Sequence, residues 1–127
     1  MLLDTQCWLW MRAAPQRLSA RTRRLLIDPA NELLLSAASV WELAIKAALG
    51  KARLPEPFGE FVTSRLAEDG IVPLPIQHIH AMRVAELPAH HRDPFDRLLV
   101  AQAQIEALSL LTADRQLEAY DVAVIRA

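Results

Sequence analysis

Four acidic side chains stand where short apolar segments of the sequence meet helical ones. Asp4 ends the run MLLD, and Glu42 lies six residues after the run LLLS. Asp96 lies in the first turn of the helical segment before the run SLLT, and Asp114 follows that run by two residues. Crowded carboxylates repel one another unless a cation neutralises them. A hard cation such as Mg²⁺ or Mn²⁺ prefers such oxygen ligands and promotes phosphodiester hydrolysis. If the fold brings these acids together, we expect a metal-dependent phosphodiesterase site.

Three of these acids also have a purely structural interpretation. The segment SVWE (39–42) fits a capping box in which Ser39 caps a helix and Glu42 reaches back to its N–H. Asp114 would cap the short segment DRQLEAY, and Asp96, in a first helical turn, gains from the helix dipole. Asp4 is the hardest to explain in this way, because a carboxylate at the end of a buried apolar strand has few structural reasons to be there.

The stretch HHRDPFDRLL (90–99) contains a fifth acid. Asp93 is followed by a proline, which is the preferred opening of an α-helix with Asp at the N-cap. Asp93 and Asp96 are three residues apart and share a helix face, so Asp93 is either a cap alone or also an auxiliary metal ligand. The side chains of His90, His91 and Arg92 either grip substrate phosphates or are solvated loop charges.

Other polar side chains accompany the acids. Lys46 lies four residues after Glu42 on the same helix face, where it forms either an ordinary surface ion pair or a contact with a substrate phosphate. Nearby hydroxyl groups either hold ligands and waters or serve in caps and turns. These hydroxyl groups belong to Thr5, Ser36, Ser39 and Thr112.

The elements that must position these side chains alternate along the chain. Short apolar runs predict buried strands at MLLD (1–4), LLLS (33–36), IVPL (71–74), SLLT (109–112) and VAVI (122–125). Segments of helical period predict helices at 5–13, 18–27, 39–50, 57–70, 76–87 and 94–108, with loops at 51–57 and 87–94. This alternation predicts an α/β fold with a helix-covered parallel sheet, whose ligand crevice lies at the carboxyl ends of the strands.

The composition limits the class of protein. The chain has 127 residues, 53% of them hydrophobic, so we expect one domain over residues 1–127. No apolar run approaches the roughly 18 residues that a membrane span needs, and Asp4 stands where a signal peptide would carry positive charge, so we expect a cytoplasmic protein with no membrane contact. Cys7 is the single cysteine, which excludes an internal disulfide and favours a buried core residue.

The charge pattern indicates only local contact with nucleic acid. A net charge of −1 gives no global attraction for it. Five arginines between residues 12 and 24, in a stretch without acids, form either a solvated helix face or a phosphate-binding patch. Several side chains of the same two helical segments either pack in the core or receive a partner's amphipathic helix. They are Trp8, Trp10, Met11, Leu18, Arg21 and Leu25.

Four segments together resemble the motifs of PIN-domain ribonucleases, specifically the VapC-type toxins of type II toxin–antitoxin systems. The segments are MLLDTQCWLW (1–10), LLLSAASVWELAIKAALGKARLP (33–55), HHRDPFDRLLVAQA (90–103) and LLTADRQLEAY (110–120). Their order and spacing match the family over essentially the whole chain. In the family these segments carry the acids of the metal site, which the resemblance places at Asp4, Glu42, Asp96 and Asp114.

The resemblance implies a three-layer α/β/α sandwich with a central parallel sheet. It also implies a Mg²⁺- or Mn²⁺-dependent endoribonuclease that hydrolyses RNA, a cognate VapB-type antitoxin that blocks the site, and a homodimer. Asp4 and Asp96 would be direct ligands, with Asp114 and Glu42 acting through water or on a second ion. The alternatives are a PIN nuclease of RNA processing or DNA cleavage without a toxin role, and a catalytically silent binding module, against which the presence of all four acids argues.

Overall fold

A parallel sheet runs through the centre of the structure, a computed structural model that describes residues 1–54 and 57–127. Within these residues the strands are β1 (Leu2–Leu3), β2 (Leu34–Ser36), β3 (Val72–Leu74), β4 (Leu110–Thr112) and β5 (Val124–Arg126). They lie in the order β3-β2-β1-β4-β5, and every neighbouring pair is parallel. The five predicted strands are therefore confirmed.

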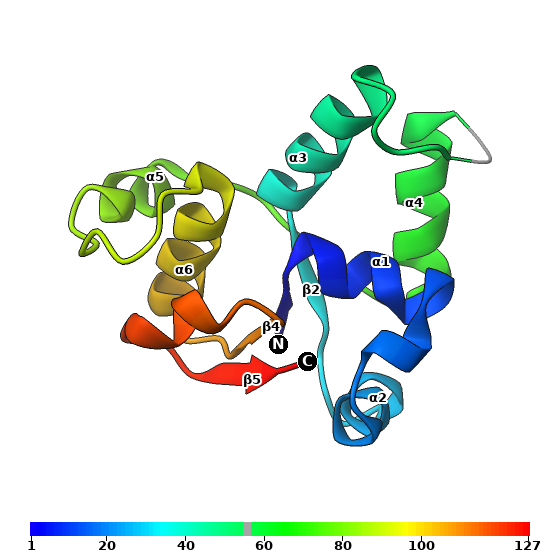
Figure 1. Ribbon diagram of the computed structural model, residues 1–127, viewed down its shortest axis with the longest axis horizontal. Coiled ribbons are helices and arrows are strands. Elements are labelled where there is room, and N and C mark those ends of the chain that lie inside the picture. The colour runs from blue at the N-terminus through cyan, green and yellow to red at the C-terminus, as the bar shows by residue number, and fades with distance from the viewer. Residues whose placement is uncertain (55–56) are drawn as a thin grey trace.

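Helices cover both faces of this sheet. They are α1 (Thr5–Ala13), α2 (Ala20–Ile27), α3 (Ala37–Ala48), α4 (Phe58–Asp69), α5 (His78–Val84) and α6 (Pro94–Glu106), with short 3₁₀ helices η1 (Pro15–Arg17) and η2 (Arg115–Ala119). Helices α1, α2 and α4 lie on one side of the sheet, and α5 and α6 lie on the other (Figure 1). The three-layer α/β/α prediction is confirmed. None of the helices in the described ranges is long and apolar enough to cross a membrane.

Successive leucines of the central strands build two separate cores. Neighbouring residues of a strand point to opposite faces of a sheet. Leu2 packs in one core with Leu99 of α6, and Leu3 packs in the other with Trp8 of α1 and Phe61 of α4. Both leucines of β1 are fully buried. This double burial explains why the central strands are continuous apolar runs rather than alternating ones.

The edge strands depart from the sequence prediction. All residues of β1, β2 and β4 are buried, whereas β3 and β5 are partly exposed, and Val72 exposes 42% of its surface. Pro73 is tolerated in β3 because an edge strand needs fewer backbone donors. The prediction of burial is thus wrong for the two strands at the edges.

The strand order fixes where a ligand site can form. The chain runs from β1 outward to β2 and β3 and then crosses to β4 on the other side of β1. In such sheets the crevice lies at the carboxyl ends of the two strands where the direction of winding changes. Asp4 directly follows β1 and Asp114 closely follows β4, so both stand at this point.

Helix α3 begins earlier than the sequence predicts. Ser36 is its N-cap, and its Oγ accepts the N–H of Ala38 at 3.0 Å. Ser39 is therefore inside the helix, and its buried hydroxyl has no hydrogen-bond partner among the described residues. The capping box of Ser39 and Glu42 is wrong, because the cap lies three residues upstream. Glu42 is consequently free to point elsewhere.

A buried hydrogen-bond network ties α3 to α6. Gln102 of α6 is fully buried; its Oε1 accepts the hydroxyl of Ser36, and its Nε2 donates to the carbonyl of Pro75 at 3.3 Å. The same Nε2 lies 3.4 Å from Nδ1 of the buried His80, whose Nε2 lies 2.8 Å from Glu106. The network fixes the N-terminus of α3 against the helix that carries Asp96.

Replacing Gln102 by Leu is expected to lower the free energy of unfolding by about 1–3 kcal/mol, because it leaves buried polar groups without partners. Urea denaturation measures this change. Gln104→Leu, on the same helix but at a more exposed hydrogen bond, is the matched control and should cost much less. Equal losses in the two variants would contradict the importance of the buried network.

Candidate metal and active site

The four predicted acids line one pocket. Asp4, Glu42, Asp96 and Asp114 come from four separate parts of the chain and surround a cavity of about 330 Å³. The other lining residues are Thr5, Gln6, Lys46 and Ala113. The cavity lies where α1, α3, α6 and the segment after β4 meet, as the strand order requires. Convergence of these acids, which the sequence left conditional on the fold, is therefore observed.

Asp4 has a structural role as well as a place in the pocket. It is the N-cap of α1: its Oδ1 accepts the N–H of Cys7 at 2.7 Å, and its Oδ2 accepts the hydroxyl of Thr112 at 2.5 Å. The sequence offered few structural reasons for Asp4, and the structure supplies one in the N-cap of α1. Burial, and secondarily the charge of Asp4, raise the pKa of the Cys7 thiol, which keeps it neutral. Cys7 is a buried core residue, as predicted.

Glu42 is held by two neighbours at the wall of the pocket. The hydroxyl of Thr5 donates to its Oε1 at 2.6 Å, and Nζ of Lys46 lies 3.2 Å from its Oε2. Of the two alternatives for Lys46, the structure shows the ion pair with Glu42. Because Lys46 also lines the pocket, its charge remains close to any ligand that enters.

Asp93 and Asp96 have different roles at the start of α6. Asp93 caps the helix: its Oδ1 accepts the N–H groups of Phe95 at 2.8 Å and of Asp96 at 3.1 Å. The cap prediction is confirmed, and Asp93 is not among the described residues that line the pocket. Asp96, in the first turn, does line it. The cap therefore fixes the backbone from which Asp96 projects.

The environment of Asp96 disfavours its charge. Burial, followed by the negative charge of Asp93, raises the pKa of Asp96 to about 7, and the charges of Asp4 and Glu42 act in the same direction. The neighbouring His91 opposes this change. Burial and the neighbouring acids thus both oppose the charged form of Asp96.

His91 reaches the site from the preceding loop. Its Nε2 lies 2.7 Å from Oδ2 of Asp114 and 3.4 Å from Oδ2 of Asp96. Its backbone N–H donates to the hydroxyl of Tyr120 at 2.9 Å. The sequence suggested only phosphate contact or solvated charge for His91. The sequence signal that could have identified this role is that His91 lies two residues before Asp93, the cap of the helix that carries the candidate ligand Asp96.

The sequence as a whole matches one family model. That model, described as PIN domain, covers residues 1–123. The chain belongs to the PIN-domain family. Two ribonucleases of Mycobacterium tuberculosis (strain ATCC 25618 / H37Rv) are similar to this PIN domain. Ribonuclease VapC22 is 35% identical over 94% of this chain and 91% of its own. Ribonuclease VapC16 is 46% identical over 46% of this chain and 42% of its own.

A solved structure is similar to this PIN domain in fold. It is VapBC2 from Rickettsia felis, bound to a DNA fragment from their promoter. The similarity covers 98% of this chain and 96% of the other, with a TM-score of 0.72 and 14% sequence identity. At this identity the likeness supports the fold alone, which agrees with the three layers seen in Figure 1.

A divalent cation fits the donor set of this PIN domain. The pocket presents carboxylate oxygens of four acids, which hard cations prefer. Burial, followed by the charges of neighbouring acids, raises the pKa of Asp96, and a bound cation would favour its charged form. His91, Asp96 and Asp114 each place one candidate ligand atom within 4.8 Å of the others. The residues present therefore suit Mg²⁺ or Mn²⁺.

Replacing Asp96 by Asn is expected to stabilise the metal-free protein above about pH 7 by on the order of 1–2 kcal/mol, after discounting for partial exposure. In the wild type, Asp96 keeps its proton to about pH 7 when folded but loses it near pH 4 when unfolded. Between about pH 4 and about pH 7 the folded chain binds one proton more than the unfolded chain, so the free energy of unfolding falls as the pH rises.

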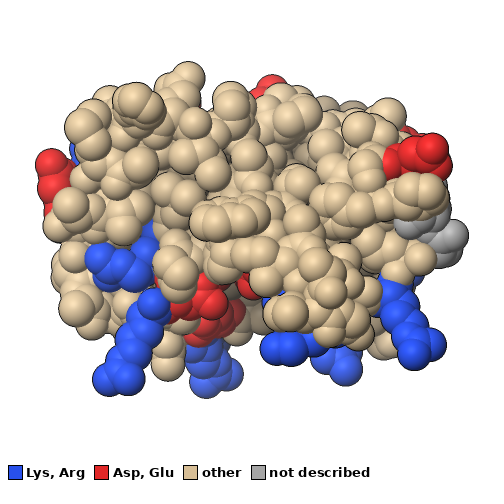
Figure 2. All heavy atoms as spheres, turned by 90° about the horizontal axis from the view of Figure 1, so that it is seen from above, with Lys and Arg blue, Asp and Glu red and all other residues tan. Residues whose placement is uncertain are grey.

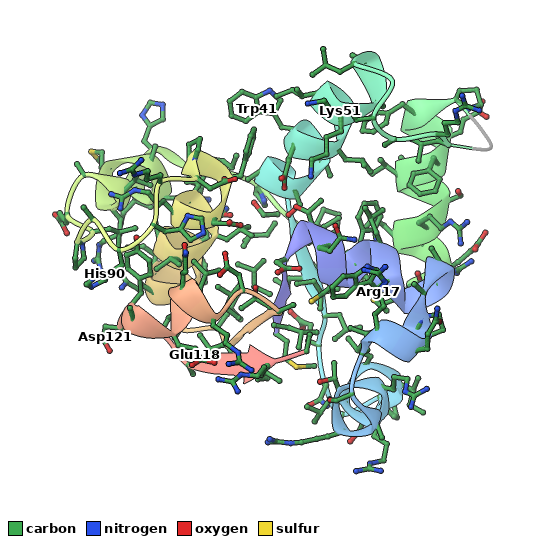
Figure 3. The ribbon with its side chains drawn as sticks, in the orientation of Figure 1. Arg17, Trp41, Lys51, His90, Glu118 and Asp121 are labelled. Atoms are coloured by element: carbon green, nitrogen blue, oxygen red, sulfur yellow. The ribbon has the colours of Figure 1, made fainter. Side chains whose placement is uncertain are left out.

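Urea denaturation with a chelator, at about pH 5 and about pH 8, measures this difference. The advantage of Asp96→Asn should be larger at the higher pH. Asp121→Asn is the control, because Asp121 is exposed and points away from the body of the protein (Figure 3). An advantage of Asp96→Asn that does not change with pH would contradict the raised pKa.

Proposed function

We propose that this PIN domain is a divalent-metal-dependent endoribonuclease and the toxin of a VapBC-type toxin–antitoxin pair. The observation that carries the proposal is the convergence of Asp4, Glu42, Asp96 and Asp114 on one pocket at the switch point of the sheet. The names of the similar proteins, Ribonuclease VapC22 and Ribonuclease VapC16, support RNA as the substrate.

In this proposal, Asp4 and Asp96 hold Mg²⁺ or Mn²⁺ directly, and Asp114 and Glu42 contribute through water or to a second ion. When bound, the ion supplies charge that polarises the phosphodiester and lowers the pKa of an attacking water. Asp93 supports the site as the cap of α6 rather than from within the pocket. Hydrogen bonds hold the carboxylates of Asp4, Glu42 and Asp114 in place, which reduces the cost of binding.

The protein's own groups position the reactants. Glu42 is fixed by Thr5 and Lys46, so its carboxylate can accept a hydrogen bond from the attacking water. Lys46 lies on the same wall, where its ammonium group can contact a phosphate oxygen. The water oxygen then bonds to phosphorus, the bond from phosphorus to the ribose oxygen breaks, and that oxygen leaves with a proton. Positioning and electrostatics supply most of the catalysis in such transfers.

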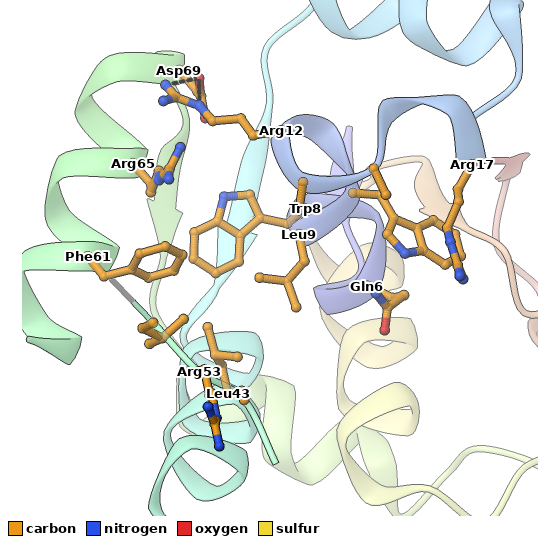
Figure 4. Close-up of a pocket in the computed structure, with 15 residues that line it drawn as sticks. Gln6, Trp8, Leu9, Arg12, Arg17, Leu43, Arg53, Phe61, Arg65 and Asp69 are labelled. Carbon is orange, nitrogen blue, oxygen red and sulfur yellow. Dashed lines mark hydrogen bonds and ion pairs between the residues drawn. The ribbon is translucent and has the colours of Figure 1, made fainter. Parts of the chain in front are cut away.

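A second, larger groove supports a protein partner. This groove, of about 740 Å³, lies between α1 and α4, and Trp8, Leu9 and Phe61 form part of its apolar lining (Figure 4). Arg12 lies at the groove and is paired with Asp69, while the guanidinium of Arg17 stands 5.4 Å from the ring of Trp10. The groove also shares Gln6 with the acid pocket. We propose that an amphipathic segment of the antitoxin binds in this groove, where it can block the site.

Only some of the side chains that the sequence suggested for a partner surface line this groove. Of the side chains for which the sequence left core packing and partner binding open, Trp8 and Trp10 line the groove, although both also pack in or against the core. Leu18 packs in the core instead. The three arginines of α2 are exposed, which fits both a solvated helix face and a phosphate-binding patch; they are Arg21, Arg23 and Arg24.

A second copy of the chain is the other partner we propose. Trp41 and Ile45 of α3 and Leu49, the C-cap of this helix, are spaced four residues apart and expose 58%, 40% and 64% of their surface. Trp41 points outward from the helix (Figure 3). The face seen from above in Figure 2 is mostly uncharged, with Lys and Arg gathered along one long edge. An apolar stripe of this kind is typical of an association surface.

Asp4→Asn is expected to abolish Mg²⁺-dependent cleavage of structured RNA, with a loss of at least about 100-fold. The wild-type activity should disappear on chelation and return with added Mg²⁺ or Mn²⁺. Cleavage is followed by sequencing the products, and the exposed substitution Asp28→Asn is the control. Cleavage by Asp4→Asn at the wild-type rate would refute the assignment, and a wild type that cleaves only DNA would favour the alternative nuclease.

Leu54→Glu in the groove is expected to weaken binding of the antitoxin, encoded by a short neighbouring reading frame, by about tenfold or more. A charge would be buried there against apolar surface. Calorimetric titration of the purified toxin with the antitoxin measures the affinity. Ile27→Glu, at an 81% exposed position outside the groove, is the control. Equal affinity of both variants would exclude the groove as the docking site.

A further inference from the structure

His91 is almost enclosed by the candidate site. Its side chain is only 12% exposed, and its Nε2 faces Asp114 at 2.7 Å and Asp96 at 3.4 Å. This position allows two roles that differ chemically. A ligand would direct a lone pair of Nε2 at the cation, whereas a hydrogen-bond donor would direct a proton at a carboxylate oxygen.

The other ring nitrogen distinguishes these roles. The backbone N–H of Asp93 donates to Nδ1 of His91 at 2.9 Å. An Nδ1 that accepts a hydrogen bond carries no proton, so the proton of the neutral ring stands on Nε2. That nitrogen can donate to a carboxylate but has no lone pair for a metal ion.

Ligation through Nε2 would disrupt the start of α6. It would place the proton on Nδ1, opposite the N–H of Asp93, so that two donors would face each other. Asp93 is the N-cap of α6, and this helix carries Asp96 into the pocket. Rotating the ring away would leave the Asp93 N–H without this partner.

Asp114 is held from two sides as a result. Its Oδ1 accepts the N–H of Gln116 at 2.9 Å as the cap of η2, and its Oδ2 faces Nε2 of His91. Its own N–H donates to Thr112 Oγ1 at 3.0 Å, and that hydroxyl donates to Asp4. A continuous series of hydrogen bonds therefore links His91 to both ends of the pocket.

We propose that His91 is a positioning residue that donates from Nε2 to Asp114 and orients this carboxylate toward the cation, and that it is not a metal ligand. The proposal rests on the proposed function, because it concerns the same pocket. It also explains the position of the loop before α6. Because His91 contacts both Asp93 and Asp114, this loop joins the helix cap to the far wall of the site.

Spectroscopy of the Mn²⁺-loaded wild-type protein tests the proposal directly. We expect electron spin-echo modulation to show no coupling from a directly bound imidazole nitrogen. Imidazole ¹⁵N shifts of the Mg²⁺-loaded protein should show His91 protonated at Nε2 and unprotonated at Nδ1. A strong coupling from a bound nitrogen, or the opposite tautomer, would overturn the proposal.

Variants of His91 provide the second test. His91→Leu removes the donor and should weaken Mn²⁺ binding by about tenfold, the lower range for groups that orient metal ligands. His91→Gln places an amide donor near the position of Nε2 and should restore most of the affinity. His90→Leu is the control, because His90 packs edge-on against Tyr120 and is not part of the pocket lining. Equal weakening by Leu and Gln would indicate a lost ligand and contradict the proposal.

The experiments distinguish the role of His91 from the existence of the metal site. Asp4→Asn tests the metal site alone, and it should lose Mn²⁺ whatever His91 does. A bound nitrogen in a protein that still needs Asp4 would overturn only the role of His91. A wild type that binds no Mn²⁺ would overturn both proposals. If His91→Leu does not fold, as judged by thermal unfolding, the wild-type spectra still decide.

Discussion

Repulsion between carboxylates is the interaction on which the rest of this structure depends. The strand order places Asp4 and Asp114 at neighbouring strand ends, and helices α3 and α6 add Glu42 and Asp96. The fold offsets part of this repulsion with helix N-termini: Asp4 caps α1, Asp114 caps η2, and Asp96 lies in the first turn of α6. Burial, together with the charges of neighbouring acids that the caps do not fully offset, raises the pKa of Asp96. This residual charge is the physical reason for proposing a cation.

Capping and metal binding are therefore not competing explanations here. A carboxylate oxygen has two lone pairs, so an acid can accept a backbone N–H and still present oxygen to a ligand. Asp4 illustrates this, because both of its oxygens accept hydrogen bonds while the residue lines the pocket. Asp93 is the residue in which only the cap is observed. Its side chain fixes the start of α6, and its backbone N–H, which donates to Nδ1 of His91, fixes the tautomer of that ring.

The remaining surfaces are arranged around this pocket. Gln6 lines both the acid pocket and the apolar groove, so a partner in the groove would lie next to the site. The second surface is the exposed apolar stripe that begins at Trp41. This residue precedes Glu42 in the chain and packs edge-on against Phe95, with ring centroids 5.0 Å apart. This contact joins α3 to α6 close to the acids. Binding at either surface would thus act on elements that carry them.

The sequence by itself determined the strands, the order of elements, the cap at Asp93 and the identity of the four acids, because apolar period, cap chemistry and family motifs are local or ordered along the chain. The tertiary structure decided the rest. It made Ser36, rather than Ser39, the N-cap of α3, because the hydroxyl of Ser36 is held in a buried network with Gln102. It also placed β3 and β5 at the edges of the sheet, where they are partly exposed. A short apolar run does not indicate whether its strand is central or at an edge. The tertiary structure also brought His91 to Asp114, 23 residues away. Such contacts depend on how distant elements pack, which no local pattern encodes.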